Sequence, residues 1–230
     1  TGKLIISAVD QRVRLSELSG QLCGGKLDGE VEVDRQSGRY ACRAVIQGAD
    51  LGELVEAAQG GEAAKTNATG TVAARLYLSG QTGDSASLTG GGEVGIERAR
   101  IFRLPLMLQI LSVLGLAAPV DAAVQSASAE FAIQGPQVEL QNILVRDNTV
   151  AMAGSGRLVR PGYLMDLRLV AVSPHRWFQM PVLTELVEGA ARELIEIRVE
   201  GKLGQPVIRA NPLRGVSGAL ETLLGREGWD

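Results

Sequence analysis

Aromatic residues make up only 3% of this 230-residue chain, and an excess of positive charge is also missing. Small-molecule pockets and platforms for single-stranded nucleic acids both rely on aromatic side chains, so their scarcity argues against either kind of site. The chain has 23 basic and 26 acidic residues, which give a net charge of −3. Binding to a nucleic-acid backbone needs a cationic surface that displaces counterions, so we expect no nucleic-acid partner.

Cysteine and histidine are equally rare. The two cysteines, Cys23 and Cys42, are expected on strands that lie two apart in a sheet, and we predict that both are free. The single histidine is His175. A zinc site needs several Cys or His ligands, so we expect neither a metal nor a cofactor. A hydrolase that uses His175 remains an alternative, but the G-x-S-x-G elbow is missing and we expect no enzyme.

One glycine motif suggests chemistry at first sight. Residues 90–95 match the pattern G-x-G-x-x-G. A dinucleotide site needs these glycines between a strand and the N-terminus of a helix, where backbone N–H groups meet the pyrophosphate. Here the alternation of a strand continues through Val94 and Ile96. We therefore interpret the glycines as bends within a strand.

The dominant pattern is an alternation of apolar residues with a period of two, interrupted by turns that contain glycine. In residues 27–33 the apolar side chains point one way and the acidic ones point the other. The pattern recurs in residues 71–96 and 127–172. It predicts a mainly β fold, a long antiparallel meander with one apolar and one polar face. No linker divides the chain, so residues 1–230 are expected to form a single domain.

A few short capping helices are expected beside the strands. Asp50 is a suitable N-cap for a helix that extends to Ala58, and residues 181–196 and 216–224 have helical spacing. Residues 104–120 carry no charge. They are expected to form a buried or capping helix, with a segment that dips into a membrane as the alternative.

An apolar sheet face must be covered, and the expected helices are few. A sheet curled into a groove or taco-like trough would solve this, with small residues leaving room for an apolar ligand. In the alternative, a closed sandwich, the same small residues allow close packing. The groove candidates are apolar residues expected on one face of the sheet, and no single one should be essential. They are Leu27, Val31, Val33, Val72, Leu76, Leu78, Val138, Leu140 and Leu144.

Four stretches, by their order and spacing, resemble the C-terminal region of AsmA-like proteins, relatives of TamB and YhdP in the bacterial envelope. The stretches are residues 18–29 with the helix start at 48–51, residues 88–94 leading to 104–106, residues 152–158, and residues 199–207 with 211–213. The resemblance extends over most of the chain, from about Leu15 to Leu213.

The resemblance implies a non-enzymatic, bridge-like lipid-transfer module, whose apolar β-groove shields acyl chains between membranes and supports outer-membrane assembly. It implies a phospholipid or another acyl-chain lipid as ligand, and envelope proteins as further partners. It also implies a periplasmic location, tethered to the inner membrane by an N-terminal anchor outside this chain. We accordingly expect a fragment of a larger protein. The alternative is a structural scaffold with a closed apolar core, which binds partner proteins at its sheet edges.

Overall fold

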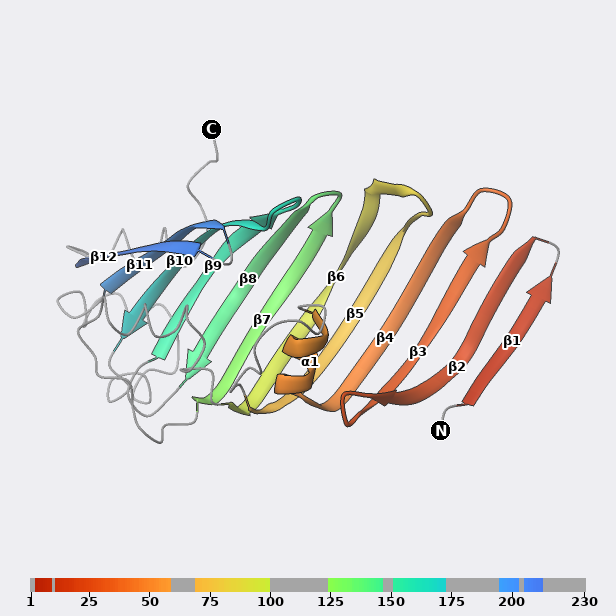
Figure 1. Cartoon of the computed structure of the whole chain (residues 1–230), viewed down its shortest axis with the longest axis horizontal. Helices are drawn as coiled ribbons and strands as arrows, with labels where there is room; N and C mark the ends of the chain where they lie inside the picture. Colours follow the sequence, from red (N-terminus) through yellow and green to blue (C-terminus); the bar gives the residue numbers. More distant parts are fainter. Residues whose placement is uncertain are drawn as a thin grey trace.

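The computed structural model describes residues 3–9, 11–58, 69–99, 124–146, 151–172, 195–202 and 205–212. These residues form one antiparallel sheet of twelve strands, in which each strand pairs with the next one along the chain (Figure 1). The strands are β1 (Lys3–Val9), β2 (Arg12–Leu22), β3 (Gly25–Asp34), β4 (Arg39–Asp50), β5 (Thr71–Gln81), β6 (Asp84–Ala99), β7 (Val124–Gln134), β8 (Gln137–Arg146), β9 (Ala151–Val159), β10 (Leu164–Val172), β11 (Ile195–Lys202) and β12 (Gln205–Pro212). The prediction of a mainly β antiparallel meander is confirmed.

Cross-strand pairing sorts the residues into rows, because residues opposite each other in neighbouring strands share a face of the sheet. One such row crosses eleven strands, from β2 to β12, and contains only glycine and apolar side chains. Its members are Leu18, Gly29, Ala44, Leu76, Gly92, Phe131, Leu140, Gly156, Leu167, Val199 and Ile208. We call the side of the sheet that carries this row the apolar face, and the other side the polar face.

A second row runs beside the first on the apolar face. Its members are Leu15, Val31, Cys42, Leu78, Gly90, Ile133, Val138, Leu158, Met165, Gly201 and Pro206. It too lacks charged side chains. The alternation read from the sequence thus extends across the whole width of the sheet, and the apolar face is continuous from β2 to β12.

The polar face carries ion pairs between neighbouring strands. Arg75 Nη1 lies 2.6 Å from Glu93 Oε1, and Arg14 Nη2 lies 2.9 Å from Glu32 Oε2. The hydrogen bond that Arg14 donates, together with its charge, lowers the pKa of Glu32. These side chains are exposed, so each pair adds little to the free energy of unfolding. These ion pairs make the polar face hydrophilic, so the two sides of the sheet differ in polarity.

The helix α1 (Leu51–Ala58) follows β4 and lies against the apolar face (Figure 1). The Asp50 carboxylate accepts a hydrogen bond of 2.9 Å from the backbone N–H of Glu53, so the predicted N-cap is confirmed. The helix contributes three apolar side chains to the hydrophobic core, which are Leu51, Leu54 and Val55. It therefore covers one end of the apolar face where β4, β5 and β6 meet it.

The sheet is not strongly curled, which corrects the taco-like trough expected from the sequence. Some of the strand glycines, interpreted there as bends, have a different use. A Cβ built on Gly92 would lie 2.9 Å from Leu76 Cα and would collide with the carbonyl oxygen of Arg75. Glycine at this position permits the close approach of β5 and β6.

Several sequence predictions need correction or fall outside the described residues. The helix predicted for residues 181–196 ends too late, because β11 already begins at Ile195. The strand β12 was not predicted; its Pro206 is compatible with a strand at the edge of the sheet. Cys23 and Cys42 are both free, as predicted. The expected helices at 104–120 and 216–224, together with His175, lie outside the described residues.

Replacing Gly92 by alanine is expected to lower the free energy of unfolding by about 1–3 kcal/mol, because the new methyl group collides with the backbone of β5. Gly95→Ala is the matched control on the same strand, since a Cβ there meets no atom within 4 Å. Urea denaturation followed by circular dichroism measures both variants. Equal midpoints for the two would contradict this account of the glycine.

Candidate functional site

The apolar face contains eight of the nine groove candidates. The pairs Leu27–Ile46, Val31–Cys42 and Val33–Tyr40 place the β3 candidates on this face. Those of β5 and β8 follow by the same pairing, and they are Val72, Leu76, Leu78, Val138 and Leu140. The structure therefore brings these side chains onto one continuous surface that spans β3 to β8.

Leu144 is the exception, because it lies on the polar face. The pairing of β8 shifts between Leu140 and Ile143, and Asn142 has a positive φ of 50°. This bulge reverses the alternation, so that Leu144 stands opposite Ser128 and Ala153. The assignment of Leu144 to the groove is wrong. The sequence contained a weak signal, since Asn is enriched among residues with positive φ, but the adjacent apolar run concealed the change of face.

Val72 lies on the apolar face but is closed off from solvent. Its side chain is 5% exposed and belongs to the hydrophobic core cluster together with Ala49 and Leu51. The other seven candidates on this face are half-buried. Val72 is thus a packing residue beside α1, whereas the remaining seven form part of a surface that a ligand could contact.

Sequence reasoning left out several residues that share this surface. Phe131 stands between Gly92 and Leu140 in the first row, and Ile133 stands between Gly90 and Val138 in the second. Both are half-buried. The signal that could have found them is the same alternation that identified Val138 and Leu140. With these two residues of β7 included, the apolar surface is continuous from β5 to β8, although Gly90 and Gly92 of β6 carry no side chain.

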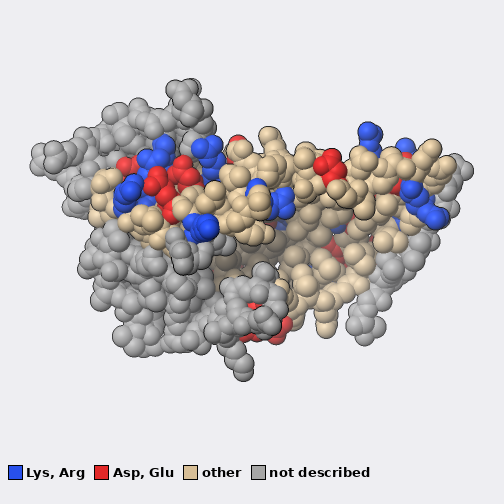
Figure 2. All heavy atoms as spheres, turned by 45° about the horizontal axis from the view of Figure 1, so that its top comes forward, with Lys and Arg blue, Asp and Glu red and all other residues tan. Residues whose placement is uncertain are grey.

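Burial changes along the apolar face. Row members on β3 to β8, such as Leu76 and Leu140, are half-buried. On β9 to β11 the same face also carries residues that are at most 5% exposed, and these are Met152, Met165, Leu169, Ala171, Ile197 and Val199. The row members Leu158 and Leu167 on these strands stay half-buried, and Ala49, Val72 and Ala99 beside α1 are buried as well. We call β2–β8 the open half and β9–β11 the closed half. Figure 2 shows charged side chains gathered in the upper part of the view, above a hollowed area with few of them.

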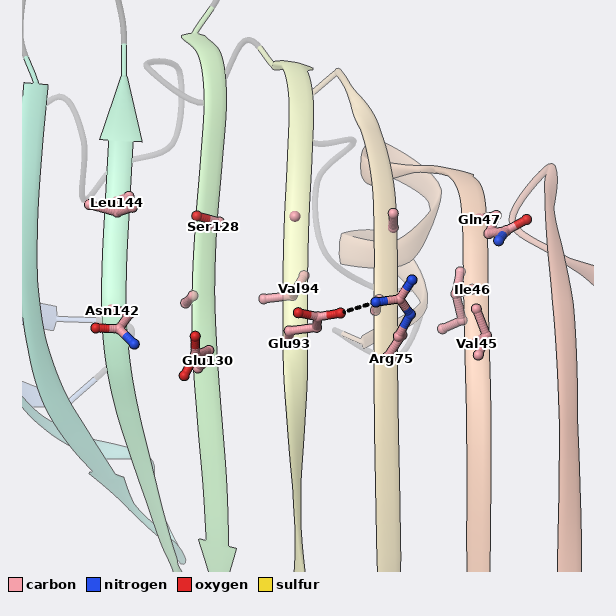
Figure 3. Close-up of a pocket in the computed structure, with 14 residues that line it drawn as sticks. Val45, Ile46, Gln47, Arg75, Glu93, Val94, Ser128, Glu130, Asn142 and Leu144 are labelled. Carbon is pink, nitrogen blue, oxygen red and sulfur yellow. Dashed lines mark hydrogen bonds and ion pairs between the residues drawn. The ribbon is translucent and has the colours of Figure 1, made fainter. Parts of the chain in front are cut away.

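A hollow also exists on the polar face. Its volume is about 360 Å³, and Figure 3 shows the Arg75–Glu93 ion pair, Glu130 and Asn142 around it. Arg75 already forms an ion pair with Glu93, and among the described residues that line the hollow no hydrogen bond joins a nucleophile to a base. Across the described residues, no group of three or more His, Cys, Asp or Glu side chains is placed to hold a metal ion. The apolar face remains the better candidate.

Comparison of the chain with protein-family models, with curated proteins and with solved structures gives no match in any of the three. A search of the described residues for a helix long and apolar enough to cross a bilayer also finds none. The geometry of the sheet is therefore the basis of the functional proposal.

The burial of Val72 leads to a prediction about stability. Val72→Asp should lower the free energy of unfolding by about 3–5 kcal/mol, because it places an unpaired carboxylate in the core. Ala73→Asp is the control on the same strand, since Ala73 is exposed and lies on the polar face. Thermal unfolding followed by circular dichroism compares the variants. A folded Val72→Asp protein with an unchanged melting temperature would show that the site is open to solvent.

Proposed function

We propose that this chain is a non-enzymatic lipid-binding and lipid-transfer module, whose apolar face shields acyl chains from water. The observation that carries the proposal is the pair of uncharged rows that cross eleven strands, with half-buried side chains throughout the open half. Large contiguous apolar surfaces on soluble proteins mark interaction sites. The width of this one, together with its aliphatic composition, favours hydrocarbon as the occupant.

The energetics of lipid transfer fit a surface without catalytic residues. Removing an acyl chain from water is favourable by about 0.8 kcal/mol for each CH₂ group. A bilayer already provides this gain in free energy. A protein surface that carries lipid therefore needs only to bury the acyl chain as favourably as the bilayer does, so that the chain avoids the cost of crossing water. Since the sheet is not strongly curled, the apolar face is a shallow surface and not a deep groove. A lipid lying on it keeps its headgroup in water.

The resemblance to AsmA-like proteins belongs to the same proposal. The four stretches that carry it fall largely on strands of the apolar face: residues 18–29 in β2 and β3, 88–94 in β6, 152–158 in β9, and 199–207 in β11 and β12. Under this proposal the ligand is a phospholipid or another acyl-chain lipid, and the module works in the periplasm, tethered to the inner membrane. It supports outer-membrane assembly together with envelope protein partners.

The reach of the sheet bears on how the module would act. Neighbouring strands lie about 4.8 Å apart, so the ten spacings between the eleven strands that the rows cross, β2 to β12, span about 48 Å. A lipid could move along the rows across this distance without meeting a charged side chain on the apolar face. Longer distances between membranes would require further sheet or a partner protein.

A structural scaffold is the second candidate function. The closed half favours it, because Ile197 and Val199 are fully buried, as in an ordinary protein core. A scaffold would bind partner proteins at the outer edges of β1 and β12, which are the two edges of the sheet. The two hypotheses differ in what they predict for the open half. The lipid-binding hypothesis predicts a lipid bound there, whereas the scaffold hypothesis predicts none.

The opposite faces of β8 supply a matched pair of substitutions. Leu140→Asp places a carboxylate on the apolar face, whereas Leu144→Asp places one on the polar face of the same strand. We expect Leu140→Asp to reduce transfer of a fluorescent phospholipid between vesicles by about tenfold or more, since burying a charge under an acyl chain is costly. Leu144→Asp should transfer lipid like the wild type.

Circular dichroism must first show that both variants are folded. Leu140→Ala serves as a second control, because a smaller apolar side chain leaves the row uncharged. Equal transfer by Leu140→Asp and Leu140→Ala would contradict the proposal that lipid passes over this face.

Native mass spectrometry of protein purified without detergent tests occupancy directly. We expect an acyl-chain lipid to co-purify in a near-stoichiometric amount, since the apolar side chains of the open half are only half-buried. Incubation with liposomes should restore the lipid after its extraction by organic solvent and refolding. A bare protein mass, unchanged by liposomes, would instead favour the structural scaffold.

A further inference from the structure

The strand ends form two opposite rims of the sheet, which differ in how the strands are connected. At one rim, which we call the turn rim, consecutive strands are joined by at most four residues, as in 35–38 and 160–163. The other rim, which we call the loop rim, carries the longer connections 51–70, 100–123 and 173–194. Figure 1 shows the turn rim at the top of the view and α1 at the bottom. Every hairpin from an odd-numbered strand to the next strand therefore turns at the same rim.

Burial of the apolar face differs between the two rims. The row nearest the loop rim contains five apolar side chains that are at most 9% exposed, and these are Ala49, Val72, Val145, Met152 and Ala171. Ile96 and Ala127 of the same row are half-buried. In the second row, which lies nearer the turn rim, Met165 is the only buried member within the described part of the chain. The apolar face is therefore more accessible from the turn rim.

One turn at this rim exposes large apolar side chains. Residues 161–164, where β9 turns into β10, are all exposed, and among them Tyr163 is 52% and Leu164 is 50% exposed. Met165 of the second row follows Leu164 directly, and its partner on β9, Leu158, is half-buried. Adjacent exposed apolar side chains beside a continuous apolar face are an arrangement that marks an interaction site.

Two basic side chains flank this turn. Arg160 precedes it, and Lys202 on β11 stands opposite Leu164. Within the residues that the structure describes, neither side chain has a carboxylate at ion-pair distance. Arg160 Nη2 instead donates a hydrogen bond of 2.8 Å to the carbonyl oxygen of Gly135 in the β7–β8 turn, which holds its guanidinium at the turn rim. The exposed turn is thus positively charged at both ends.

The remaining charges of the turn rim have the same sign balance. Asp34 accepts hydrogen bonds of 2.9 and 3.0 Å from backbone N–H groups of the β3–β4 turn, and Asp84 accepts one of 2.9 Å from Ala86. These carboxylates stabilise their own turns, whereas Arg35 and Arg39 have no ion pair among the described residues. Figure 2, in which this rim comes forward, shows basic side chains at intervals along it. The rim therefore attracts an anionic surface.

From the accessible second row, the exposed turn and its basic flanks, we propose that the β9–β10 turn docks this protein on an anionic lipid bilayer. The inference rests on the proposed lipid-binding function. Tyr163 lies at the level of the headgroups, where its ring and its hydroxyl both find favourable surroundings. Leu164 enters the boundary of the acyl chains, and Arg160 and Lys202 contact lipid phosphates. An acyl chain that leaves the bilayer here reaches Leu158 without crossing bulk water.

Co-sedimentation with vesicles of phosphatidylcholine, with or without phosphatidylglycerol, tests the docking surface. The wild type should bind the vesicles that contain phosphatidylglycerol. Tyr163→Ser combined with Leu164→Ser should lower the partition coefficient about tenfold or more, because the strength of interfacial binding scales with the buried apolar area. Tyr77→Ser is the matched control, since Tyr77 is 57% exposed but lies on the polar face, and it should bind like the wild type.

Circular dichroism first shows that these variants are folded. Binding of the Tyr163→Ser and Leu164→Ser double variant at the level of the wild type would overturn the proposal. So would a wild type that binds neither kind of vesicle.

A second pair of variants separates the charge of the turn rim from the net charge of the protein. Lys202→Gln should lower binding to phosphatidylglycerol vesicles about fivefold, since a basic residue near an anionic surface contributes about that factor. Lys26→Gln removes the same charge from the loop rim, where Lys26 forms an ion pair of 2.6 Å with Asp28, and it should have little effect. An equal loss in both variants would contradict docking through the turn rim.

The failure of lipid binding gives a different result from the failure of this inference. Native mass spectrometry after incubation with vesicles reports a bound lipid, whereas co-sedimentation reports docking. If the turn variants lose vesicle binding but the wild type carries no lipid, the docking surface stands and the proposed function is wrong. If the wild type carries lipid but the turn variants bind vesicles as it does, the proposed function stands and the docking surface is wrong.

Discussion

The pairing register between consecutive strands is the constraint on which the rest of the structure depends. Every described strand pairs only with its neighbours in sequence, so no long crossover fixes the order of the sheet. A slip of one residue in any hairpin would move all side chains of that strand to the other face. The two uncharged rows exist because ten successive registers, from β2 to β12, agree, and the ion pairs on the polar face, such as Arg75–Glu93, add a charge-based preference for the same registers.

Much of this arrangement could be predicted from the sequence. In a strand with one solvent-exposed face, polar and apolar residues alternate, and this alternation shows which side chains point to each face of the sheet. Val31 and Leu78 were assigned to a common face in this way, and the pairing through Cys42 places them there. The Asp50 cap was readable for a similar reason, since it depends on residues only three positions apart. Such local patterns predict strands, turns and caps. Because each strand of the meander pairs with the next one along the chain, little further information was needed to predict the sheet.

The predictions that failed depend on information that alternation does not contain. Leu144 was misplaced because the bulge at Asn142 lies beside three consecutive apolar residues, which look the same in either register. The curl of the sheet was overestimated because a strand glycine is compatible with either bending or close approach, and only the position of Leu76 relative to Gly92 distinguishes them. The burial of Val72 depends on the position of α1, which no pattern within β5 reveals.

The composition of the apolar face bears on the choice between a lipid and a protein as its occupant. Protein interfaces obtain most of their binding energy from a few aromatic or arginine anchors that fit matching pockets. The first row holds one aromatic residue, Phe131, among aliphatic side chains and glycines, and it holds no arginine. Such a surface offers a protein partner few points of specific contact. A hydrocarbon chain needs none, because its burial is non-directional and proportional to area. The same uniformity would allow an acyl chain to slide along the row without a large barrier.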